Sequence, residues 1–192
     1  SPEISFGCSI ISKPYLRAAM LDHFNNIGIV EEKWEYMAIY YAMIVPQGFG
    51  SIHSIPYYTH PLVTYNLTKE DKINLAFGLK NLCKLLIHSG SIKLFPSIIN
   101  SPIISNIAEL KNLPEIIDPN ISSLMTVHLF SSCPIGEDKS KCVANSYGKL
   151  FGENNIYISD GSMLPSAPGV NPQGSIMALA HRNIEKIISE EL

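Results

Sequence analysis

One long amphipathic helix constrains the fold of this 192-residue chain more than any other feature. Residues 69–89 carry apolar side chains at steps of three and four, the spacing of one face of an α-helix. Thr68 is a favourable N-cap residue, and Gly90 is typical of a position that ends a helix. We therefore predict a helix that packs one apolar stripe against a core. The stripe consists of Ile73, Ala76, Phe77, Leu79, Leu82, Cys83 and Leu86.

The rest of the first two thirds reads as short helices and strands. Residues 14–24 are compatible with a helix. Residues 34–45 are apolar on both faces and predict a buried strand, or two strands. Two further short strands are predicted at 51–55 and 63–67. Residues 97–120 lack a sustained period and predict a loop or a short-helix connection.

The last seventy residues hold the positions of most chemical interest. An apolar run at 156–159 predicts a buried strand that ends at Asp160-Gly161. Asn171-Pro172 opens a final helix that runs to about Glu190, because Asn favours the N-cap and Pro the first helical position. An unpaired helix N-terminus attracts negative charge, so Asn171 is a candidate for an anion or cofactor site. The alternatives are that Asn171 only caps the helix and that Asp160 only forms a turn.

Composition excludes several classes of protein. The chain is 46% hydrophobic, which excludes a disordered tail, and its net charge of −3 gives no electrostatic case for nucleic acid. No window approaches eighteen consecutive apolar residues, so no membrane span is predicted. The four scattered cysteines favour free thiols and a reducing compartment such as the cytoplasm, although Cys133 and Cys142 could close a short loop. No signal peptide can be read in the first eight residues.

His128 is the strongest single candidate for acid–base chemistry, although a lone histidine can also be a satisfied core residue. The other histidines show no spacing typical of a metal site, and none is predicted. Ser131 and Ser132 lie nearby, but no G-x-S-x-G motif supports a serine hydrolase. No glycine-rich phosphate-binding motif occurs either, so this chain must rely on something else to hold most of a dinucleotide.

Four segments, taken together with the order in which they follow one another, resemble the C-terminal part of the glucose–methanol–choline (GMC) oxidoreductases, a flavoprotein family. They read HLFSSCPIG at 128–136, YGKLFG at 147–152, NIYISDGSMLPSAPGVNPQGSIMALAHRN at 155–183 and, upstream, GFGSIHSIPYYTHPLVTYNLTKED at 48–71. Ser131-Ser132 stands where many members have Gly-Thr. The resemblance implies a mixed α/β and α+β fold with two parts. Residues 1–120 would belong to an antiparallel-sheet substrate domain, and 121–192 would complete a Rossmann-like FAD-binding domain.

The resemblance also implies site residues and a reaction. The family's active-site histidine falls on His128, and its partner falls on Asn171. Asp160 and Gly161 would contact the flavin, with Pro172 and Gln173 near its pyrimidine edge. A neutral imidazole suits a base that works near neutral pH, and an amide can orient an alkoxide oxygen. The implied activity is oxidation of an alcohol or sugar CH–OH group, with the hydride passed to FAD.

The N-terminal half of the family pattern, with its dinucleotide fingerprint, is missing from this sequence. We therefore expect an enzyme that is inactive without an N-terminal FAD-binding half as its partner. The alternative is a non-catalytic fragment that retains the fold without activity. A serine hydrolase is a more distant alternative.

Overall fold

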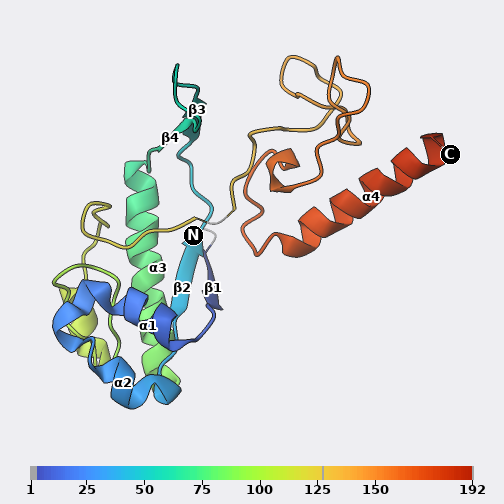
Figure 1. Cartoon of the computed structure of the whole chain (residues 1–192). Coiled ribbons are helices and arrows are strands. Elements are labelled where there is room, and N and C mark those ends of the chain that lie inside the picture. The colour runs from blue at the N-terminus through green and yellow to red at the C-terminus, as the bar shows by residue number, and fades with distance from the viewer. Residues whose placement is uncertain (1–3, 127, 192) are drawn as a thin grey trace. The chain divides into compact units, whose positions relative to one another are not determined.

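The computed structural model describes residues 4–126 and 128–191, which form two compact units, Ser1–Leu124 and Met125–Leu192 (Figure 1). Each unit combines helices with loops, and the first adds small antiparallel sheets. This mixed character agrees with the coarse fold prediction. The roles predicted for residues 1–120 and 121–192 as two functional domains stay predictions. No helix among the described residues is long and apolar enough to cross a bilayer.

The first unit is organised by a two-stranded sheet and one long helix (Figure 1). Strand β1 (Ile4–Cys8) pairs antiparallel with β2 (Tyr40–Ile44), and Ile4 lies opposite Ile44. Helix α3 (Lys69–His88) packs against this sheet at Gly78. A Cβ atom added to Gly78 would lie 3.3 Å from the Ala42 Cβ and 3.5 Å from the Ile4 Cγ2. One face of the sheet is therefore covered by α3.

Helix α3 confirms the prediction made for residues 69–89. It begins with a capping box in which the Thr68 hydroxyl accepts from the Asp71 N–H and the Asp71 carboxylate accepts from the Thr68 N–H. Both bonds satisfy N–H groups that a helix leaves unpaired at its first turn. Gly90 follows the helix with a φ of +96°, a conformation that suits a residue without a side chain.

The prediction of a strand over the whole of residues 34–45 is wrong. Within this range the strand is confined to β2, while Trp34–Tyr36 forms a 3₁₀ helix directly after α2 (Ile29–Lys33). Trp34 packs against a buried cluster of Leu16, Met20 and Val30, so tertiary packing of a helical segment overrides its strand-like composition. The helices that build this cluster are α1 (Lys13–Ala19), the 3₁₀ helix Met20–Asn26 and α2.

The remaining elements of the first unit follow the predictions. Strand β3 (Gly50–His53) pairs antiparallel with β4 (Leu62–Tyr65), and both strands are exposed along their length. Within residues 97–120 the connection contains one short 3₁₀ helix, Ile107–Asn112. This connection packs against another side of α3, where Ile104 and Leu113 are buried against Cys83.

In its described residues the second unit consists of loops, the short 3₁₀ helix Gly161–Met163 and the helix α4 (Gln173–Glu191), which confirms the predicted final helix (Figure 1). The buried strand predicted at 156–159 is wrong. Tyr157 makes one isolated bridge with Lys149, and Ile156 is 47% exposed. The Ile158 N–H donates to the Gly148 carbonyl and the Leu150 N–H to the Ile156 carbonyl, so the segment forms a short looped pair and not a buried sheet strand. All four cysteines are free thiols, as predicted.

Candidate functional site

A pocket of about 330 Å³ in the second unit brings two separate segments together. One wall comes from the segment that carries His128, and the other from the turn at Asp160-Gly161. A residue in the first turns of α4, Ile176, also lines the pocket. The lining residues are His128, Leu129, Phe130, Ser132, Asp160, Gly161, Ser162 and Ile176.

Main-chain hydrogen bonds hold the two walls side by side. The Ser131 N–H donates to the Leu164 carbonyl at 2.8 Å, and the Cys133 N–H donates to the Ser162 carbonyl at 3.1 Å. A third, longer bond of 3.4 Å joins Ile135 N to Met163 O. Because these bonds use only backbone atoms, the histidine segment is held beside the Asp160 turn whatever side chains the two segments carry.

Asp160 gives the pocket a fixed negative charge. Its carboxylate caps the 3₁₀ helix Gly161–Met163 by accepting from the Ser162 N–H at 2.8 Å, and it also accepts from the Ser162 hydroxyl. The side-chain and backbone hydrogen bonds from Ser162 lower the pKa of Asp160 below its usual range. Asp160 is therefore ionised at neutral pH and can accept hydrogen bonds from hydroxyl groups of a ligand.

Gly161 stands where three parts of the site meet. A Cβ atom at this position would lie 3.3 Å from the Ile176 Cδ1, 3.7 Å from the Phe130 Cε1 and 3.8 Å from the Leu129 carbonyl oxygen. The first of these distances is tighter than ordinary van der Waals contact. The absence of a side chain therefore allows α4 and the histidine segment to approach the turn closely.

His128 is half-buried at the pocket wall. Its ring stacks on Phe130, with centroids 6.1 Å apart and an interplanar angle of 24°. A stacked aromatic neighbour restricts the orientation of the imidazole without consuming either ring nitrogen. The arrangement leaves the imidazole suited to proton transfer with a group in the pocket.

The other three predicted site residues lie at the start of α4. The Pro172 carbonyl accepts from the Ile176 N–H at 2.9 Å, which forms the first turn of the helix, and Pro172 itself is buried. Asn171 and Gln173 are exposed and, like Pro172, do not line the pocket. The structure thus brings His128, Asp160 and Gly161 together and places Asn171, Pro172 and Gln173 within about one turn of the pocket residue Ile176.

Sequence reasoning missed the residue that anchors α4 beside the site. Asn183 is 2% exposed, and its Nδ2 atom donates to the sulfur of Met163 at 3.4 Å. Met163 is fully buried at the end of the Asp160 turn. The signal was present, because Asn183 continues the spacing of Ile176 and Ala180 and so lies on the inward stripe of the helix.

No group of three His, Cys, Asp or Glu residues within the part of the chain that the structure describes could hold a metal ion. The polar side chains of the pocket are one imidazole, one carboxylate and two hydroxyls, from His128, Asp160, Ser132 and Ser162. This set suits a ligand that carries hydroxyl groups.

Comparison with known proteins gives one consistent family. A family model described as GMC oxidoreductase matches residues 53–180, two thirds of the chain. The GMC-type oxidoreductase y4nJ of Sinorhizobium fredii is 37% identical over 191 residues, which cover 98% of this chain and 37% of that protein.

Two more distant relatives carry related names. A GMC-type oxidoreductase of Mycobacterium tuberculosis is 29% identical over 144 residues, 75% of this chain and 23% of its own length. The long-chain-alcohol oxidase FAO1 of Arabidopsis thaliana is 26% identical over 163 residues, 78% of this chain and 21% of its own length. The chain therefore spans little more than a third of the length of the Sinorhizobium relative. It spans less than a quarter of the length of the Mycobacterium and Arabidopsis relatives.

Proposed function

Because this chain belongs to the glucose–methanol–choline oxidoreductase family, we propose that it forms part of an FAD-dependent enzyme that oxidises the CH–OH group of an alcohol or sugar. The observation that carries the proposal is the shared pocket of His128 and the Asp160-Gly161 turn. The name of the Arabidopsis relative, a long-chain-alcohol oxidase, supports an alcohol as substrate.

The residues present fit one portion of FAD. The ionised Asp160 suits the hydroxyl groups of the ribityl chain and repels phosphate, while Gly161 leaves the turn open to close approach. The pocket lies at the lower end of the range for ligand sites, roughly 300–1,000 Å³, so it holds only part of a dinucleotide. The first turn of α4 adds a positive dipole end for the pyrimidine edge, near Pro172 and Gln173.

In this proposal His128 and Asn171 have different roles toward the substrate hydroxyl group. An unprotonated imidazole nitrogen of His128 takes the proton of the substrate hydroxyl. The Asn171 amide donates to the same oxygen, which stabilises its developing negative charge and orients the carbon. FAD, when bound, supplies the acceptor for the hydride that leaves this carbon.

The proposal includes a second part of the enzyme. The chain contains no phosphate-cradling sequence motif and spans 37% of the Sinorhizobium relative, so the remaining FAD contacts would come from an N-terminal half outside this chain. Ser1–Leu124 would then serve as a portion of the substrate domain, and Met125–Leu192 would complete the Rossmann-like FAD-binding domain.

Co-expression tests this function. The chain is produced together with the part of the Sinorhizobium protein that it does not match, and the purified complex is examined for flavin absorbance and alcohol oxidation. We expect a yellow complex that oxidises alcohols, whereas the chain alone binds FAD poorly and oxidises none. A complex that binds no flavin would favour the alternative, a fragment that retains the fold without activity.

His128→Ala in that complex should retain the flavin and lose turnover by a factor of about 100 or more, the usual contribution of a general base. The matched control is His181→Ala, because His181 is an exposed histidine of the same unit that faces Glu185 on α4. Unchanged turnover in the His128 variant would exclude this histidine as the base.

A further inference from the structure

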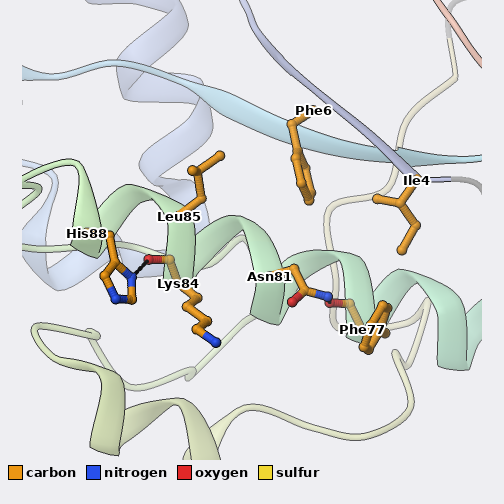
Figure 2. A pocket seen from close by; sticks show the side chains of 7 residues that line it. All are labelled: Ile4, Phe6, Phe77, Asn81, Lys84, Leu85 and His88. Carbon is orange, nitrogen blue, oxygen red and sulfur yellow. Dashed lines mark hydrogen bonds between the residues drawn. The ribbon is translucent and has the colours of Figure 1, made fainter. Parts of the chain in front are cut away.

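Two histidines of the first unit are held in place by hydrogen bonds to their rings. His88, at the end of α3, donates from Nδ1 to the Lys84 carbonyl at 2.8 Å, and Figure 2 shows this bond as a dashed line. His23 is buried and donates from Nε2 to the Pro96 carbonyl at 2.7 Å. Each bond uses one ring nitrogen as a donor, and that nitrogen cannot take a proton from a substrate.

The imidazole of His128 is held in a different way. Among the residues that the structure describes, no hydrogen bond joins either ring nitrogen to the protein, since the bond at His128 uses its main-chain carbonyl, which accepts from the Thr126 hydroxyl at 3.3 Å. The ring instead stacks on Phe130, with the two planes inclined by 24°. Asp160 lines the same pocket, but its carboxylate accepts from the N–H and the hydroxyl of Ser162. The plane of the imidazole is therefore set by an aromatic ring and not by a carboxylate.

Phe130 also lies against the turn that forms the other wall of the pocket. A Cβ atom at Gly161 would lie 3.7 Å from the Phe130 Cε1, so the edge of the ring is close to the backbone of the turn. The absence of a side chain at Gly161 makes room for this edge. One ring therefore stacks on the imidazole and rests on the turn, and it links the position of His128 to the position of that turn.

The backbone directly after Phe130 has an unfavourable conformation that the structure enforces. Ser131 has a φ of +65°, which is uncommon for a residue with a side chain. Its N–H donates to the Leu164 carbonyl at 2.8 Å, and this bond holds the segment against the turn. Strain of this kind persists only where the surroundings impose it, and it gathers at functional sites. The strained residue is the immediate neighbour of the ring that orients the candidate base.

Building on the proposed function, we infer that Phe130 is a positioning residue, whose ring fixes the plane of the His128 imidazole so that a ring nitrogen faces the substrate hydroxyl in the pocket. Stacking needs a flat face, so an aromatic side chain can do this and an aliphatic one of similar size cannot. Half a turn of the imidazole about its Cβ–Cγ bond leaves the stack intact. The protein therefore fixes the plane, and the bound substrate selects which nitrogen faces it.

Carbon-13 relaxation of labelled histidine rings in the full chain tests this placement without flavin. We expect the His128 ring to be as rigid as the buried His23 ring in the unmodified chain and in Phe130→Tyr. In Phe130→Leu it should become as mobile as the exposed His181 ring. Phe151→Leu, at a half-buried phenylalanine of the same unit outside the pocket, is the matched control and should leave His128 rigid. A His128 ring that stays rigid in Phe130→Leu, or that is mobile in the unmodified chain, overturns the inference.

Kinetics of the complex with the unmatched part of the Sinorhizobium protein test the consequence for turnover. Phe130→Leu should lower kcat by a factor of about 10 to 100 and change KM little, because a misdirected base affects the transition state more than substrate binding. Phe130→Tyr should retain most of kcat, and Phe151→Leu all of it. Flavin absorbance and amide protection within α4 show that the variants are loaded and folded. An unchanged kcat in Phe130→Leu, or equal losses in the Leu and Tyr variants, overturns the inference.

The two experiments separate this inference from the proposed function. A complex that binds no flavin and oxidises no alcohol contradicts the proposed function, while ring relaxation in the full chain still shows whether Phe130 holds the His128 imidazole. An active complex in which Phe130→Leu keeps its full kcat contradicts the positioning role alone.

Discussion

Helices α3 and α4 are nearly equal in length, with 20 and 19 residues, and the sequence predicts an apolar stripe on each. In α3 part of the stripe is buried, with Ala76 at 1% exposure and Leu82 at 4%, although Phe77 is 49% exposed. In α4 the corresponding residues Met177 and Ile184 remain 63% and 51% exposed. The same sequence pattern therefore has two outcomes, and the difference lies in what each unit packs against its helix.

The two units are consequently held together in different ways. The clusters of buried hydrophobic residues found in the described part of the chain all lie in the first unit. The loops and helix of the second unit are held to one another mainly by main-chain hydrogen bonds between loops and by the buried side chain of Asn183. Substitutions that remove packing should act strongly in the first unit, and substitutions that disturb backbone geometry should act strongly in the second.

The largest expected effect is that of Ile104→Ala. Ile104 is fully buried against Cys83 and Leu113, and truncation of such a side chain typically costs about 2–5 kcal/mol of stability. Ile184→Ala on the half-exposed face of α4 should cost less than about 0.5 kcal/mol. Urea unfolding followed by hydrogen exchange of α3 and of α4 measures each unit separately. Equal losses would remove the distinction between the two helices.

The second largest effect is expected for Asp71→Asn, which should lower the free energy of unfolding of the first unit by about 2 kcal/mol. The Asp71 carboxylate is fully buried and accepts from the N–H groups of Gln47 at 2.7 Å, Gly48 at 3.0 Å and Thr68 at 2.9 Å. An amide cannot accept at both positions, so at least one of these donors loses its partner. Glu70→Gln, at the exposed neighbouring position, is the control and should change the free energy of unfolding little.

The same carboxylate also gives the first unit a pH dependence. Burial alone would raise the pKa of Asp71, but the hydrogen bonds from Gln47, Thr68 and Gly48 outweigh it and lower the pKa below its usual value. The unfolded chain then binds the proton more readily, so this contribution is complete above about pH 4 and declines as the pH falls further. The slope of unfolding free energy between pH 5 and 3 should be smaller in the Asn variant.

A matched glycine pair tests the second unit. Gly148 and Gly152 both have a φ of +85°, which costs a residue with a side chain about 1–2 kcal/mol. A Cβ atom at Gly148 would lie 2.4 Å from the Ile158 carbonyl oxygen and 3.0 Å from the Asn183 Nδ2, whereas nothing lies within 4 Å at Gly152. Gly148→Ala should therefore destabilise α4 more than Gly152→Ala, as measured by its hydrogen exchange. Equal effects would show that the close contacts do not matter.

The smallest expected effect is a gain from Ser131→Gly. Ser131 has a φ of +65°, where a side chain is unfavourable, so glycine should stabilise the second unit by about 0.5 kcal/mol after its own entropic cost. Ser132→Gly, at a neighbouring position outside that conformation, should destabilise it by a similar amount. Thermal unfolding of the two variants measures the sign, and a loss in both would contradict the conformational argument.

The fold was predictable from the sequence where local signals sufficed. Thr68 and Gly90 bound α3 correctly because capping depends on residues within one turn. The first part of residues 34–45 was interpreted wrongly, because Trp34 lies in a 3₁₀ helix and is placed by contacts with distant residues such as Leu16, whereas Tyr40–Ile44 forms a strand as predicted. The link from Asp71 to Gln47 spans 24 positions and leaves no periodic trace in the sequence.

The candidate site also has one part that the sequence predicted and one part that it did not. The sequence and its family resemblance selected His128 and Asp160, and the structure places both in one pocket. Their chemical roles, and the pairing of His128 with Asn171, stay predictions. What the sequence could not reveal is the backbone pairing of Ser131 with Leu164, because main-chain bonds carry no side-chain signature.

That pairing also determines how freely the site can diversify. The two walls of the pocket are fastened by atoms that every amino acid except proline possesses in full, so exchanging Ser132 or Leu129 would alter the lining and leave the scaffold in register. A library that varies these two positions should therefore change the shape and polarity of the pocket with little loss of folding yield.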